Sequence, residues 1–182
     1  MNLFDKQYLT DYTYTEEIND KGHIVTRAKY SGAFFAFVDE KKAKAAAKLM
    51  TVLLVLAWGL YLTPMCFLSL STTVMWVMLP NIFLLIPLAF AIRKLVTALR
   101  VKAPFEHKPN DKVTNYAFVT WPGMILGAYS SVSSLVLSFT QPEKLIQPGD
   151  WLYVICNLLV AGFFALLDIK AKDMDTHAVS HG

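Results

Sequence analysis

The residues best placed to do chemistry in this sequence are polar side chains inside long apolar runs. Asn81 and Asn157 each lie within such a run. An amide in that position has two uses: it forms a hydrogen bond between helices, or it lines a polar path for an ion or small molecule. The residue types do not separate these two readings, so both stay open.

Ionisable side chains are absent from the middle of every apolar run. Arg93 and Asp168 fall at run ends, where a charged group can reach the water. Proton-coupled carriers and acid–base enzymes need a buried titratable group. The sequence therefore predicts a non-enzymatic protein without a cofactor, with Asp168 as the only catalytic candidate near the bilayer.

Two polar segments contain residue types that bind metals. One set comprises His23, Glu106, His107 and Asp111; the other comprises Asp173, Asp175, His177 and His181. Their spacings are common in solvated loops and define no coordination geometry, so we predict no metal site. Cys66 and Cys156 lie at similar depths in their runs, and the sequence leaves open whether they are bonded.

Four apolar runs must position these residues, and they define the fold class. They cover residues 49–70, 73–92, 116–139 and 151–169. Each has the ~17–25 residues that a helix needs to cross the hydrocarbon core of a bilayer. Hydrophobic residues make up 55% of the chain and charged residues 17%, which disfavours a soluble domain. We predict an all-α integral membrane protein with four antiparallel transmembrane helices, forming a domain over residues 39–182.

The third run contains a stripe of small residues on one helical face. Gly123, Gly127 and Ser131 recur every four residues, and Ser134 belongs to a second small stripe beside them. Such a stripe allows another helix backbone to approach closely. We predict that these four residues pack helices against one another. Packing within the four-helix unit is favoured over packing between two copies of the chain.

Residues 1–38 differ in composition and form a separate cytoplasmic segment. Strand-forming residues at 12–15 and 23–26 flank turn-forming residues at 19–22, which predicts a β-hairpin. The aromatic residues of 31–38 predict a segment at the membrane interface. The tail after Ile169 is short and polar.

Asp39 has the side chain of a helix N-cap, so the first helix is expected to begin there, before the apolar run. Basic side chains follow on the next turns, and we predict that they contact lipid headgroups or a partner. These are Lys41, Lys42, Lys44 and Lys48.

The distribution of basic residues predicts the orientation. Sixteen of the seventeen Lys and Arg residues lie on one side of the four runs; Lys144 is the exception. By the positive-inside rule, both termini face the cytoplasm, and the membrane is expected to be a bacterial plasma membrane. Acidic residues among the bases and the lack of a recognition motif argue against nucleic acid as a partner.

Two functions fit these features. The first is a subunit or scaffold of a membrane complex, in contact with the lipid bilayer and with further copies or a different membrane partner. The alternative is a small transporter or channel component that works as an oligomer. In that case Asn81, Asn157 and the serines of residues 116–139 would line a polar path.

Overall fold

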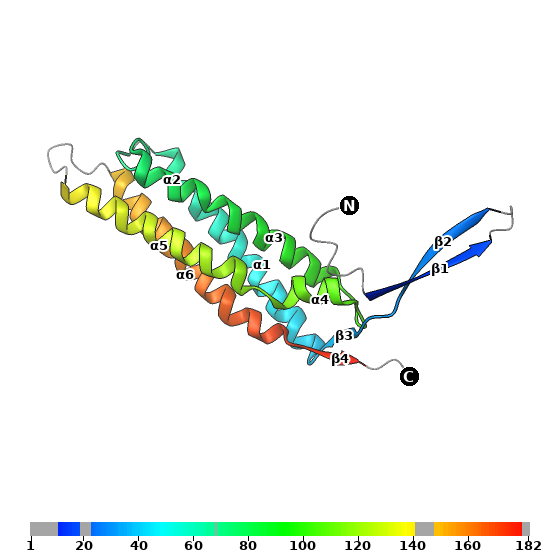
Figure 1. Cartoon of the computed structure of the whole chain (residues 1–182). Coiled ribbons are helices and arrows are strands. Elements are labelled where there is room, and N and C mark those ends of the chain that lie inside the picture. Colours follow the sequence, from blue (N-terminus) through cyan, green and yellow to red (C-terminus); the bar gives the residue numbers. More distant parts are fainter. Residues whose placement is uncertain (1–10, 19–22, 68, 141–147, 180–182) are drawn as a thin grey trace.

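The structure, a computed structural model, describes residues 11–18, 23–67, 69–140 and 148–179 of the 182-residue chain. Within these residues, four long apolar helices form a bundle, with two small antiparallel sheets at one end (Figure 1). The predicted fold class is confirmed for the four apolar helices and the N-terminal two-stranded sheet. We call the end of the bundle beside the sheets the hairpin end, and the opposite end the distal end.

The helices follow the apolar runs but begin and end at different residues. Their bounds are α1 (Glu40–Leu62), the short 3-10 helix η2 (Thr63–Cys66), α2 (Met75–Phe83), α3 (Leu85–Arg100), α4 (His107–Thr114), α5 (Ala117–Thr140) and α6 (Pro148–Ala171). The predicted cap at Asp39 is confirmed, because its Oδ1 accepts a hydrogen bond from the backbone N–H of Lys42 at 2.9 Å. The helix therefore starts nine residues before the run that predicted it.

Prolines explain where the structure departs from the predicted spans. The run 49–70 was expected to be helical throughout, but α1 ends at Leu62 and a 3-10 turn with Pro64 near its start follows. The run 73–92 is divided at Leu84 into α2 and α3. Pro80 and Pro87 flank this point, and each removes one backbone hydrogen bond from the helix ladder. At the break, the N–H of Leu84 donates to the carbonyls of both Pro80 and Asn81 at 3.1 Å, so these two acceptors keep a partner.

The bundle has an apolar outer surface and a partly polar interior. α6 packs between α1 and α5, and α3 packs between α1 and α5 on the other side. On α5, the side chains of Phe118, Ile125, Val132 and Phe139 recur every seven residues and are all more than half exposed. Serines and asparagines lie inside instead. These four candidate membrane-spanning helices imply contact with a lipid bilayer, because hydrocarbon accepts such an outer surface and water does not.

The first sheet is the predicted hairpin. Strands β1 (Tyr12–Ile18) and β2 (Ile24–Tyr30) pair antiparallel, and they project away from the hairpin end of the bundle (Figure 1). The predicted turn at 19–22 lies outside the described residues. We use the term hairpin for these two strands.

The second sheet was not predicted. β3 (Phe34–Phe37) pairs antiparallel with β4 (Thr176–Val179), so the aromatic segment after the hairpin forms a strand with the C-terminal tail. The backbone groups of Phe34–Phe37 need hydrogen-bond partners near the bundle, and the tail supplies them.

Candidate functional site

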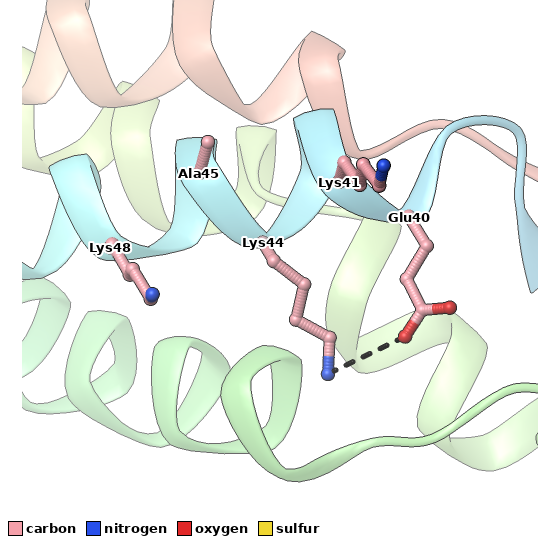
Figure 2. Close-up of a pocket in the computed structure, with 5 residues that line it drawn as sticks. All are labelled: Glu40, Lys41, Lys44, Ala45 and Lys48. Carbon is pink, nitrogen blue, oxygen red and sulfur yellow. Dashed lines mark ion pairs between the residues drawn. The ribbon is translucent and has the colours of Figure 1, made fainter.

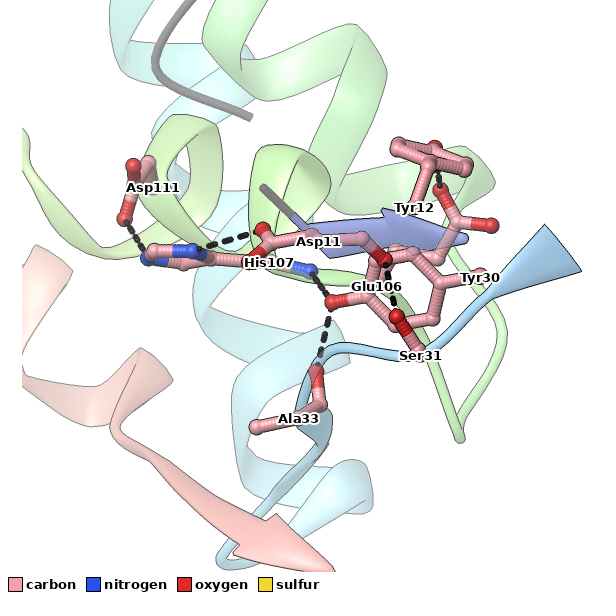
Figure 3. A network of polar contacts seen from close by, with 8 residues as sticks. All are labelled: Asp11, Tyr12, Tyr30, Ser31, Ala33, Glu106, His107 and Asp111. Atoms are coloured by element: carbon pink, nitrogen blue, oxygen red, sulfur yellow. Dashed lines mark hydrogen bonds and ion pairs between the residues drawn. The ribbon is translucent and has the colours of Figure 1, made fainter. Parts of the chain in front are cut away.

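The hairpin is attached to the bundle through a polar contact region that we call the hairpin base. It comprises Asp11, Tyr12, Tyr30, Ser31, Glu106 and His107, and Figure 3 shows it. The backbone carbonyl of Asp11 accepts hydrogen bonds from the N–H groups of Ser31 and Gly32, at 2.7 and 3.1 Å. These bonds close the hairpin where its two strands leave the bundle.

Two tyrosines connect the hairpin to the loop before α4. Tyr12 donates its hydroxyl proton to Oε2 of Glu106 at 2.8 Å. The Tyr30 hydroxyl donates to the carbonyl of Ala33 at 2.8 Å and accepts from the backbone N–H of His107 at 3.0 Å. Because His107 is the first residue of α4, this bond also satisfies a backbone donor that the helix itself cannot pair.

The His107 ring lies between two carboxylates. Its Nδ1 is 3.2 Å from Oδ2 of Asp11, and its Nε2 is 3.5 Å from Oδ1 of Asp111. The metal set considered from sequence is not brought together: His23 precedes β2 at the far end of the hairpin, whereas His107 is at its base. Among the described residues, no group of three or more His, Cys, Asp or Glu side chains is arranged to hold a metal ion. His181 of the second set lies outside them.

The hairpin base is expected to open at alkaline pH. The hydrogen bond to Glu106, followed by burial, raises the pKa of Tyr12 from 10.0 to about 12. Folding therefore favours the protonated tyrosine, so its contribution is complete below pH 10 and is lost as the pH rises through about 12. Titration of tyrosinate absorbance should show a late transition near pH 12 in the wild type, whose amplitude falls by one tyrosine in Tyr12→Phe.

A second variant tests whether Glu106 raises the pKa of Tyr12. Glu106→Gln should move the late transition toward lower pH, because the neutral amide no longer opposes the tyrosinate charge. Tyr14→Phe, which changes the next tyrosine along β1, is the matched control and should keep the late transition. A titration in which Tyr12→Phe and the wild type coincide would contradict the assignment.

The loop before α4 is itself held by the second sheet. Phe35 and Phe105 exchange backbone hydrogen bonds at 2.7 and 2.9 Å. Thr176 of β4 donates to Oδ1 of Asn110 at 2.6 Å, and the N–H of Val38 donates to the carbonyl of Asp175 at 3.0 Å. The hairpin base therefore rests on a surface built from three segments that are distant in sequence.

The four lysines predicted to contact headgroups or a partner lie on α1 at the hairpin end. Lys42 pairs with Asp173 at 3.0 Å, and Lys44 donates to the carbonyl of Val101 at 3.1 Å. With Glu40 and Ala45, three of the lysines line a surface pocket of about 430 Å³: Lys41, Lys44 and Lys48 (Figure 2). Glu40 is 3.9 Å from Lys44, so this surface is basic but not purely cationic.

The small residues of α5 lie against α6. A Cβ placed on Gly123 would be 2.5 Å from the Phe164 ring, and one on Gly127 would be 3.0 Å from the carbonyl oxygen of Asn157. Ser131 donates to the carbonyl of Val154 at 2.9 Å. A side chain at either glycine position would therefore require the neighbouring atoms of α6 to shift.

A carboxylate at the distal end has a structural role that the sequence did not indicate. Asp150 is buried in the first turn of α6, and its Oδ1 accepts from both the N–H and the hydroxyl of Ser71, at 2.9 and 2.6 Å. Ser134 of α5 is 2.6 Å from the same hydroxyl, and because Ser71 donates to Asp150, Ser134 must donate to Ser71. An acidic residue in a first helical turn was the available signal, but its partner 79 residues away was not.

The two asparagines are fully buried but incompletely paired. Both amide atoms of Asn81 lack a hydrogen-bond partner among the described residues, so the interhelical bond considered for it is not formed there. Asn157 donates to the carbonyl of Tyr153 in its own helix, and its Oδ1 has no partner within the part of the chain that the structure describes. Tyr153 of α6 donates to the carbonyl of Val77 of α2 at 3.1 Å. Asn157 and Asn81 each follow one of these two residues by four positions, or about one helical turn. Both side chains therefore lie at one depth in the bundle.

The remaining sequence candidates have structural partners or remain free. Asp168 accepts from the hydroxyl of Thr120 at 2.6 Å, which joins α6 to α5 near the hairpin end. Cys66 is exposed, Cys156 is buried, and both are free thiols.

No protein-family model matches the chain, and comparisons with curated proteins and with solved structures also gave no match. Function is therefore inferred from the contacts within the chain.

Proposed function

We propose that this chain is a non-enzymatic subunit or scaffold of a membrane complex, and that the hairpin is its docking element. The observation that carries the proposal is the contrast between the two ends of the hairpin. Its base is fixed by side-chain and backbone hydrogen bonds, whereas Ile18 and Ile24 at the far end are 76% and 69% exposed. Large apolar side chains that are exposed at the end of a fixed hairpin indicate a surface that binds another protein.

The proposed setting is a bacterial plasma membrane with both termini in the cytoplasm. The basic residues support this orientation, because those on α1 and the loop after α3 belong to the hairpin end. The hairpin then projects into the cytoplasm rather than into lipid. A two-stranded sheet is marginally stable in water, so an added strand from a partner would stabilise it. The open edge of the hairpin offers the partner backbone groups already arranged for such pairing.

The proposal is tested by recovering partners from membranes after cross-linking. Ile18→Ser combined with Ile24→Ser changes only the far end of the hairpin, and is expected to remove the specific partner that the wild type retains. Deletion of residues 1–30 should have the same effect. The matched control is Ile125→Ser, on the outer surface of α5. Equal recovery by the wild type and the double variant, with equal expression, would exclude the hairpin as the docking element.

The transporter or channel alternative is favoured by one observation: the amide of Asn81 is buried inside the bundle and has no hydrogen-bond partner among the described residues. A buried polar group without a hydrogen-bond partner costs about 1–3 kcal/mol of stability. An asparagine at this position is therefore easier to explain if its amide contacts a transported ion or solute. If it lines a path, Asn81→Leu should abolish ion or solute flux in liposomes, and Ile82→Leu, on the outer surface next to it, should not. Flux that is absent from wild-type liposomes, or unchanged by Asn81→Leu, would remove the alternative.

A further inference from the structure

The two strands of the hairpin carry opposite charges. The charged residues of β1 are Glu16 and Glu17, and those of β2 are Arg27 and Lys29. Across the ladder, Arg27 forms an ion pair with Glu17 at 3.1 Å, and both side chains are more than half exposed. The hairpin therefore has one acidic outer edge and one basic outer edge.

Both outer edges are open as far as the described residues are concerned. Within the described residues, the sheet has two strands, so β1 and β2 each have one strand neighbour. All residues of the two strands are exposed except Tyr12 and Tyr30, which are intermediate in exposure and belong to the hairpin base. An open strand edge with free N–H and C=O groups is a template for another strand unless the protein blocks it.

A shared membrane restricts which strands can meet. Every copy inserted in the same direction sends its hairpin out from the same face of the bilayer. β1 then runs away from the membrane in all copies, and β2 runs back toward it. Two β1 strands or two β2 strands side by side would be parallel, with like charges adjacent; β1 beside β2 is antiparallel, with opposite charges adjacent.

We infer that the partner of the hairpin is a second copy of this chain, whose β2 edge pairs with the β1 edge of the first in a continuous antiparallel sheet. The inference rests on the proposed function, because it requires membrane insertion and a hairpin that docks. The bilayer holds all hairpin bases at one height, so neighbouring copies meet in the register of the hairpin itself. In that register Glu17 of one copy is diagonal to Arg27 of the next, which repeats the ion pair seen within each copy.

The faces of the hairpin also agree with this arrangement. By the alternation of a β-strand, Tyr14, Ile18 and Ile24 share one face, and Glu17 and Arg27 share the other. Copies related by rotation about the membrane normal keep each face on one side of the shared sheet. Such β1-to-β2 contacts are heterologous, so they close into a ring when the rotation permits it. Tyr14, Ile18 and Ile24 of neighbouring copies then lie on the same face of the shared sheet.

Charge reversal tests the pairing in nanodiscs or liposomes that contain two differently labelled copies, with energy transfer as the readout. A basic variant, Glu16→Lys with Glu17→Lys, and an acidic variant, Arg27→Glu with Lys29→Glu, should each associate with themselves about tenfold more weakly than the wild type. A mixture of the two should recover association, because opposite edges meet again. Arg100→Glu with Lys102→Glu, two exposed basic residues at the end of α3 and just after it, is the matched control and should leave association unchanged.

Cysteine pairing tests the register without changing charge. In a background of Cys66→Ser and Cys156→Ala, chains with Tyr14→Cys and chains with Ala28→Cys, two positions opposite in the ladder, are mixed in one membrane. Oxidation should cross-link the mixture and neither variant alone. Cross-linking of either variant alone, or energy transfer absent from the wild type, would overturn the inference.

Loss of a different partner on deletion of the hairpin would still support the proposed function, and failure of the chain to remain in membranes after alkaline extraction would refute both.

Discussion

Replacing Asp150 with alanine is expected to lower the free energy of unfolding by about 3 kcal/mol. The variant removes an acceptor that serves two N–H groups and one hydroxyl, from Leu70 and Ser71. Ser71 is buried, so its donors would lose their partner without gaining water. Reversible unfolding in mixed detergent micelles measures the loss, and the distal end of the bundle should become accessible to protease first.

Two variants separate the carboxylate from the rest of this contact. Asp150→Asn keeps one acceptor oxygen and should lose about half as much stability. Ser134→Ala removes only the hydroxyl that donates to Ser71, and should cost about 1 kcal/mol. If Asp150→Ala unfolds like the wild type, the turn after α1 is not held by α6.

Replacing Gly127 with leucine is expected to be as damaging, with a loss of about 3 kcal/mol in the free energy of unfolding. The added Cβ would lie 3.1 Å from both the Cβ and the backbone nitrogen of Ala161, and the rest of the side chain has no space between the helices. Since backbone atoms cannot rotate away, α5 and α6 must separate. Reversible unfolding in mixed micelles and cross-linking between the two helices both report this change.

Gly162 on α6 is the matched control, because a Cβ placed there meets nothing within 4 Å. Gly162→Leu should keep or slightly raise stability, since it replaces a glycine inside a helix without a clash. Gly123→Ala should fall between the two: its added carbon overlaps the Phe164 ring, which must shift as a unit. Equal stability of the Gly127 and Gly162 variants would show that the close approach of α5 and α6 is not required.

Local physics explains what could be predicted from the sequence. A bilayer demands long uncharged helices, so run length alone identifies the four apolar helices. The cap at Asp39 and the pairing of the hairpin strands depend on residues within a few positions of one another or across one turn. The ends of the spans differed from those of the apolar runs, because prolines interrupt the helices within two of these runs.

Only the tertiary structure decided how distant segments meet. The pairing of Phe34–Phe37 with Thr176–Val179 joins residues about 140 positions apart, and no local preference indicates it. The same is true of Asp150 with Ser71 and of Tyr12 with Glu106. A carboxylate or tyrosine in a sequence carries no information about its partner, because that partner is chosen when helices of fixed length bring particular ends together. The sequence by itself thus determined which segments are helices and strands and that the helices suit a membrane, whereas the packed bundle determined which polar side chains are buried, which are paired, and which surface remains open.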